Sequence, residues 1–179
     1  VHQHLRGIPL KALDATIDDN LVAEWWNAYR KYALTDLPKR RLPLINLSAP
    51  LAGRRLVARY DMLAFSDDHV TIVEWKTEPE RPTRDALQQR MQTVIYPYLL
   101  AQAGAQHNNG QRINPARISL VYWFTEAPQQ PEIFEYSAEQ FAADGALLDK
   151  LAADILRRNA DAFELTDNLD LCQFCAYRS

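Results

Sequence analysis

The chain has 179 residues, 47% hydrophobic and 24% charged, a size and balance that favour one globular domain with a well-buried core. Its net charge of −3 excludes a global field that draws the chain to nucleic acid, so any such contact would use a local basic patch, for example at Arg54 and Arg55 or at residues 39–41. No apolar run reaches the roughly 18 residues needed to span a bilayer, and no secretory leader is visible, so we expect a cytosolic protein without membrane association.

The N-terminal part of the chain predicts two helical segments. Residues 1–13 are typical of the end of a helix, which Gly7 terminates. Residues 16–33 predict a second, amphipathic helix with Thr16 or Asp18 as its N-cap. The apolar side chains of this helix fall near helical spacing: Leu21, Val22, Trp25, Tyr29 and Tyr32.

The middle of the chain predicts three strands and a long helix. Strands are expected at residues 44–51, 54–65 and 69–77, and the turn-forming sequence SDDH joins the second strand to the third. Residues 84–104 predict a single amphipathic helix that Pro97 kinks.

The C-terminal part predicts two strands and a final helix, at residues 117–125, 132–137 and 138–158. Ser137 and Gln140 are placed as a capping box for this helix. An irregular tail follows at residues 165–179. The order of the elements predicts an α/β fold with a mixed central sheet flanked by helices, in one domain of residues 1–179.

Two carboxylates and a lysine stand out on the hairpin of the second and third strands. If SDDH forms the turn, Asp61 lies directly opposite Glu74, with Cβ atoms roughly 5 Å apart. Lys76 projects from the same side as Glu74, because alternate side chains of a strand share a face. Two carboxylates beside a lysine suit Mg²⁺, which polarises a phosphoryl oxygen while the lysine orients or deprotonates the attacking water. The alternative is an exposed strand edge with ordinary charge pairs.

The long helix adds two polar groups. Gln92 and Tyr96 are four residues apart and lie on one helix face, where an amide and a phenol can reach a phosphate or metal-bound waters. The alternative is that Tyr96 belongs to the core and Gln92 to its boundary.

The segments RYDMLAF, VTIVEWKTE and QTVIY together resemble the PD-(D/E)XK nuclease superfamily, in particular its RecB-like branch. That branch carries an Asp after the second strand, then D/E-x-K-T, then a helix with Q-x-x-x-Y. The matching residues, in order and spacing, are Asp61, Glu74, Lys76, Thr77, Gln92 and Tyr96. The resemblance covers residues 55–100. One departure is Tyr60, which stands where a small residue is usual.

This resemblance implies a restriction-endonuclease-like fold and a role for each matching residue. Asp61 and Glu74 would bind Mg²⁺ or Mn²⁺, and Lys76 would serve the nucleophilic water. Thr77, Gln92 and Tyr96 would support the site or contact the DNA strand.

Two histidines and two cysteines also resemble ligand residues that occur in this family. A histidine on the first helix is often a further metal ligand, which makes His2 and His4 candidates, with an isolated surface histidine as the alternative for each. Some RecB-like nucleases hold an iron–sulfur cluster with four cysteines. Only Cys172 and Cys175 are present here, so we expect no cluster in this chain.

The preferred function is metal-dependent hydrolysis of DNA phosphodiester bonds, within a DNA repair, recombination or defence system. Because the net charge of −3 argues against tight DNA binding by the chain alone, we expect a partner such as a helicase or another nucleic-acid-processing protein. The alternative is a catalytically inactive nuclease-like domain that acts as a DNA- or protein-binding scaffold. The sequence contains no nucleophile elbow, zinc motif or phosphate-binding glycine loop, so it does not support a small-molecule hydrolase on another fold.

Overall fold

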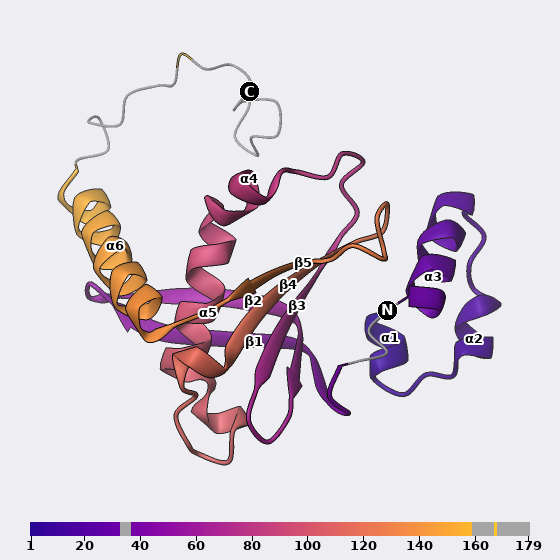
Figure 1. Cartoon of the computed structure of the whole chain (residues 1–179), viewed down its shortest axis with the longest axis horizontal. Helices are drawn as coiled ribbons and strands as arrows, with labels where there is room; N and C mark the ends of the chain where they lie inside the picture. The colour runs from indigo at the N-terminus through magenta and orange to yellow at the C-terminus, as the bar shows by residue number, and fades with distance from the viewer. Residues whose placement is uncertain (33–36, 159–166, 168–179) are drawn as a thin grey trace.

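The computed structural model describes residues 1–32, 37–158 and 167, and it contains a five-stranded mixed sheet (Figure 1). In sheet order, the strands are β1 (Arg40–Leu51), β2 (Arg54–Phe65), β3 (Val70–Lys76), β4 (Ile118–Phe124) and β5 (Glu132–Glu135). The β3–β4 pair is parallel and the other three pairs are antiparallel. The predicted α/β fold with a mixed sheet flanked by helices is therefore confirmed.

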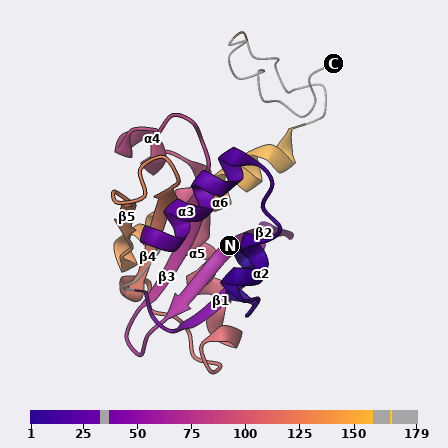
Figure 2. The ribbon, with the colours of Figure 1, turned by 90° about the vertical axis from the view of Figure 1, so that its right-hand side faces the viewer.

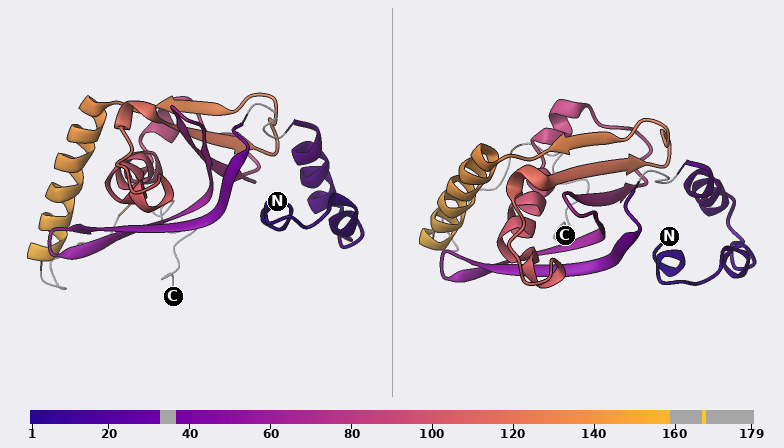
Figure 3. Two further views of the ribbon diagram at one scale, coloured as in Figure 1. Left: turned by 90° about the horizontal axis from the view of Figure 1, so that it is seen from below. Right: turned by 60° about the horizontal axis from the view of Figure 1, so that its bottom comes forward.

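The crossover between the parallel strands β3 and β4 carries the helices of one face of the sheet. It contains α4 (Arg84–Gln88), α5 (Met91–Ala103) and the 3₁₀ turns η1 (Gly104–His107) and η2 (Pro115–Arg117). The strands curve around α5, and the last helix, α6 (Ala138–Arg157), lies beyond it (Figure 3). The main hydrophobic core fills the space between sheet and α5, with fully buried side chains that include Leu63, Ile72, Leu99, Leu100 and Leu120.

Three N-terminal helices lie at the other side of the sheet (Figure 2). They are α1 (His2–Leu5), α2 (Leu10–Asp14) and α3 (Asn20–Tyr32). A separate hydrophobic cluster joins Trp26 and Tyr29 of α3 to Trp123 of β4. Among the described residues, no helix has the length and apolar character that crossing a membrane requires.

The helix boundaries differ from those predicted at two places near the N-terminus. The chain forms a further helix, α2, after Gly7, whose φ of +93° turns the backbone. The N-cap of α3 is neither Thr16 nor Asp18, because the Asp19 carboxylate accepts a hydrogen bond from the backbone N–H of Val22 (2.9 Å). Residues 165–179, predicted as an irregular tail, lie outside the described residues apart from residue 167.

The helix predicted at residues 84–104 is in fact two helices. Arg90 has an extended backbone (φ −67°, ψ 136°) that ends α4 and starts α5. Its guanidinium makes two hydrogen bonds to the Glu78 carboxylate (2.8 and 2.9 Å). The Leu87 carbonyl at the end of α4 accepts from the Thr93 hydroxyl (2.5 Å) and from the Arg90 backbone N–H (3.1 Å). These contacts stabilise the break, so side-chain interactions outside the helix override helix propensity here.

The start of α6 follows the predicted capping only in part. The Ser137 hydroxyl accepts from the backbone N–H of Gln140 (3.1 Å), as predicted. The Gln140 amide, instead of returning to Ser137, donates to the buried carboxylate of Asp144 (2.8 Å).

The hairpin of β2 and β3 has the predicted register. Its ladder runs from the pair Phe65–Val70 to the pair Met62–Val73. Asp61 and Glu74 are the next two residues beyond this last pair. On its other side β2 pairs with β1, where Leu44 has a φ of 55° at the position facing Asp61. A leucine at positive φ marks local backbone strain. The irregular part of the sheet therefore surrounds Asp61.

Candidate active site

Asp61 and Glu74 lie together beyond the last ladder pair of the β2–β3 hairpin. Glu74 Oε1 accepts a hydrogen bond from the Asp61 backbone N–H (3.1 Å). In return, Asp61 Oδ2 accepts from the Trp75 backbone N–H (3.0 Å). The two carboxylates thus take over the role of backbone carbonyls at the end of the hairpin, and each is held in place by the opposite strand.

Gln92 of α5 connects Glu74 with Lys76. Its amide nitrogen donates to Glu74 Oε2 (2.7 Å), and its amide oxygen accepts from Lys76 Nζ (2.7 Å). Gln92 lies in the first turn of α5, so the break at Arg90 sets where this amide meets β3. The structure therefore brings together Asp61, Glu74, Lys76 and Gln92, four of the residues predicted for the site.

Tyr96, one helical turn after Gln92, fixes the position of β2. Its hydroxyl donates to the Arg59 carbonyl (2.9 Å), and the Tyr60 hydroxyl donates to the Tyr96 carbonyl (2.9 Å). The two tyrosine rings also pack, with centroids 4.8 Å apart. Tyr60 is fully buried in this contact, so the departure from a small residue at this position serves the packing of α5 on β2.

Burial shifts the ionisation of both central charges. The Glu74 residue is only 4% exposed, and burial together with the nearby Asp61 carboxylate raises the pKa of Glu74 to about 8. Burial lowers the pKa of Lys76, against the opposing effect of the Glu74 charge. An acid and a base whose pKa values both move toward neutrality are typical of catalytic sites.

The structure brings one of the two predicted histidines to this site. His2 Nε2 lies 3.6 Å from Asp61 Oδ1 and is buried without a hydrogen-bond partner among the described residues. Burial lowers the pKa of His2, which favours the neutral imidazole. His4 instead places Nδ1 2.8 Å from the Tyr29 hydroxyl and packs against the rings of α3.

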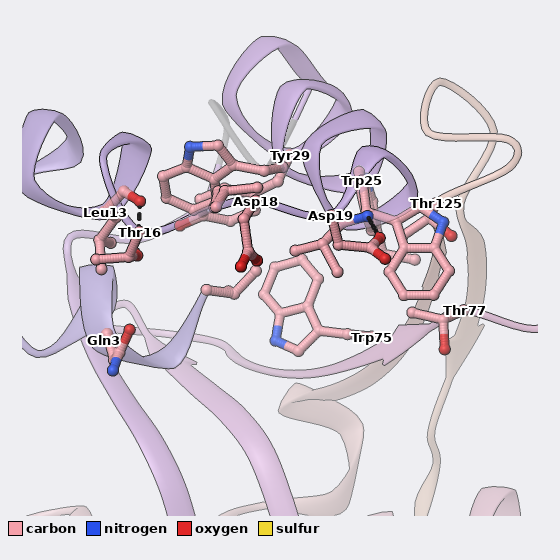
Figure 4. Close-up of a pocket in the computed structure, with 15 residues that line it drawn as sticks. Gln3, Leu13, Thr16, Asp18, Asp19, Trp25, Tyr29, Trp75, Thr77 and Thr125 are labelled. Atoms are coloured by element: carbon pink, nitrogen blue, oxygen red, sulfur yellow. Dashed lines mark hydrogen bonds between the residues drawn. The ribbon is translucent and has the colours of Figure 1, made fainter.

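The remaining predicted residues lie elsewhere. Thr77 follows β3 and lines a pocket on the α3 side of the sheet (Figure 4), and Gln92 is not among the residues that line this pocket. Cys172 and Cys175 lie outside the described residues.

The side chains at this site are of the types that bind a divalent cation, but they are not yet grouped closely around one point. Carboxylate oxygens are the preferred ligands of Mg²⁺ and Mn²⁺. An imidazole nitrogen is a ligand of transition-metal ions, so a histidine here favours Mn²⁺ over Mg²⁺. Asp61 Oδ1 accepts no hydrogen bond among the described residues, and the His2 Nε2 beside it has no partner. Over the described ranges, no three His, Cys, Asp or Glu side chains already form a group that could hold a metal ion.

Sequence reasoning did not identify Tyr122 as part of this site. Tyr122 pairs with Glu74 across the parallel β3–β4 ladder, and its ring centroid lies 5.1 Å from Lys76 Nζ. Its hydroxyl is 2.8 Å from the Thr93 hydroxyl of α5. The register of two parallel strands depends on the crossover between them, so a sequence pattern does not reveal this neighbour.

Comparison with known proteins gives one family match. The profile described as "PD-(D/E)XK nuclease superfamily" matches residues 7–179. No curated protein matches the chain.

Two solved structures are similar in part. The protein SSO0001 is 16% identical, with a TM-score of 0.43, over 80% of this chain and 59% of its own. A protein described as a candidate exonuclease from Eubacterium rectale is 9% identical, with a TM-score of 0.44, over 87% of this chain and 64% of its own. The chain therefore spans less than two thirds of the length of either protein.

Proposed function

We propose that this chain, which belongs to the PD-(D/E)XK nuclease superfamily, hydrolyses phosphodiester bonds of DNA with a divalent metal ion held by Asp61 and Glu74. The observation that carries this proposal is the Gln92 bridge, which holds a carboxylate and an amine side by side, next to a second carboxylate. The Q-x-x-x-Y spacing of Gln92 and Tyr96 supports membership of the RecB-like branch. A cytosolic location and a helicase-type partner belong to the same proposal.

The chain's own residues divide the work of the reaction between them. Asp61 and Glu74 supply oxygen ligands, and the bound cation would polarise the phosphoryl oxygen. Gln92 holds Lys76 Nζ beside this site. The lowered pKa of Lys76 increases its neutral amine fraction, so that Nζ can orient the attacking water and take its proton.

The test of this function is incubation of the purified protein with single-stranded and duplex DNA, in the presence of Mg²⁺, Mn²⁺ or a chelator. We expect cleavage with either metal and none with the chelator, because the carboxylates need a cation to bind a phosphate. DNA binding without cleavage in every condition would contradict the proposal and favour the scaffold alternative. The presence of all three charged residues argues against that alternative.

We further propose that His2 is a third metal ligand, since its buried Nε2 lacks a partner and lies beside Asp61. His2→Ala is expected to weaken Mn²⁺ binding about tenfold, the lower end of what loss of a supporting group costs a metal site. Isothermal titration of metal-free protein with Mn²⁺ measures this. His4→Ala is the matched control, because His4 lies on the same helix but contacts Tyr29. Equal Mn²⁺ affinity of the two variants would exclude His2 as a ligand.

A further inference from the structure

An open pocket lined by aromatic side chains lies across β3 from Glu74 and Lys76. Its volume is about 380 Å³, within the range of small-molecule sites. We call it the aromatic pocket. All four tryptophans of the chain line it, together with one tyrosine: Trp25, Trp26, Trp75, Trp123 and Tyr29.

Part of this aromatic set is structural. The Trp75 and Trp123 rings meet edge to face with centroids 5.5 Å apart, and Tyr29 meets Trp75 in the same way at 5.6 Å. Trp26 stacks on Tyr29 at 5.3 Å. These contacts attach α3 to the sheet, yet they leave the pocket volume unfilled. Trp25, which also lines the pocket, is only half-buried. Packing alone therefore does not account for the pocket, since protein interiors are normally close-packed.

The charge of the aromatic pocket excludes phosphate. No lysine or arginine lines it, whereas Asp18 and Asp19 do. Asp19 caps α3, but the Asp18 carboxylate has no hydrogen bond or ion pair within the described part of the chain, and its side chain extends toward the Trp75 ring (Figure 4). A flat, uncharged ring with N–H donors suits these surroundings, because it can stack on the aromatic side chains and donate to Asp18.

The aromatic pocket and the proposed metal site are formed by the same two segments, the end of β3 and the start of the chain. Trp75, whose ring lines the pocket, donates its backbone N–H to Asp61 Oδ2. Trp75 is also the chain neighbour of Lys76, and the rise from one residue to the next along an extended strand is about 3.3 Å. At the start of the chain, Val1 and Gln3, the two chain neighbours of His2, also line the pocket. The two sites thus lie on opposite faces of the same end of β3, so a DNA strand that crosses this end of the sheet passes both of them.

We propose that the aromatic pocket binds an unpaired base of the DNA strand that is cleaved, an inference that rests on the proposed function. A base inside a duplex is stacked on both faces and has to be flipped out before it can enter, which has an energetic cost. The substrate is therefore DNA with a single-stranded segment at the cleavage point.

Intrinsic tryptophan fluorescence tests this directly, because every tryptophan of the chain lines the pocket. Metal-free protein in chelator is titrated with a short single-stranded oligothymidylate, with an abasic strand of equal length and charge, and with free thymidine monophosphate. We expect saturable quenching by the oligothymidylate, none by the abasic strand, and weak quenching by the monophosphate. Equal effects of the normal and abasic strands would overturn the proposal. So would quenching by choline alone, which would indicate an aromatic cage for a cation.

A variant pair localises the effect. Trp25→Ala is expected to weaken binding of the labelled oligothymidylate about tenfold, the scale of one lost base–aromatic stack. Leu21→Ala is the control, because Leu21 is exposed on the same helix and does not line the pocket. Unchanged affinity of Trp25→Ala would also overturn the proposal. Cleavage without base-dependent quenching would reject the pocket alone, and base-dependent quenching without cleavage would reject the catalytic function alone.

Discussion

Replacement of Asp61, Glu74 or Lys76 by alanine is expected to lower metal-dependent DNA cleavage about 10³-fold or more in each case, while the protein stays folded. The substitution of Asp61 or Glu74 would remove a ligand of the cation, and the substitution of Lys76 would remove the amine that serves the attacking water. The loss is large because the three side chains act as one unit, so none of them compensates for another. Single-turnover cleavage of a labelled oligonucleotide, with circular dichroism as the folding check, measures the effect.

The matched control is Asp67→Ala, which removes an exposed carboxylate from the turn of the same hairpin. It should cleave at the wild-type rate. Wild-type cleavage by any two of the three site variants would remove the assignment of this site, whatever activity the chain has.

In the absence of metal, Glu74 is expected to make the free energy of unfolding fall as the pH rises from about 5 to 8. The pKa of Glu74 is about 8 in the folded protein, against an ordinary value of 4.5. Between these values the folded state keeps a proton that the unfolded state has released, so each pH unit costs up to about 1.4 kcal/mol. Glu74→Gln removes this dependence and is expected to be more stable than wild type at pH 8, by an amount on the order of a few kcal/mol.

Urea unfolding at several pH values in chelator measures this difference. The lowered pKa values of His2, His4 and His107 have the opposite effect, since stability rises with pH as they lose their protons in the unfolded state. The wild type and Glu74→Gln share these histidines, so the difference between their curves isolates Glu74. Parallel curves would show that Glu74 titrates normally.

The same residue predicts a response to metal. A cation that binds the ionised carboxylates binds only the folded state, so millimolar Mg²⁺ or Mn²⁺ at pH 8 should raise the melting temperature of the wild type. The shift should be absent in Asp61→Ala and preserved in Asp67→Ala. An unchanged wild-type melting curve would show that Asp61 and Glu74 do not bind a cation together.

The parts of the site that lie on the β2–β3 hairpin were predictable from the sequence. The four-residue turn and the alternation of two strands determine the register, which places Asp61 beside Glu74 without knowledge of the rest of the fold. The position of Gln92 followed less directly. Its helix begins at Met91, because Arg90 is extended and bound to Glu78, which interrupts a segment that the sequence predicts as one helix.

The features that join distant segments were not predictable. Tyr122 lies beside Lys76 because β4 pairs with β3 in parallel, and no local sequence pattern encodes the register of that pair. The aromatic pocket combines α3 with the ends of β3 and β4, and its tryptophans look like ordinary core residues when each is seen in its own segment. Tertiary arrangement alone turns them into one surface.

The Gln92 bridge has a consequence for how the site meets its ligands. An amide is electrically neutral, with a donor end that suits an anion and an acceptor end that suits a cation. By standing between Glu74 and Lys76, Gln92 separates the carboxyl group from the amine, so that the two form no direct ion pair. An arriving cation therefore meets a carboxyl group that is already in position, and its charge favours the ionised form of Glu74 that burial disfavours.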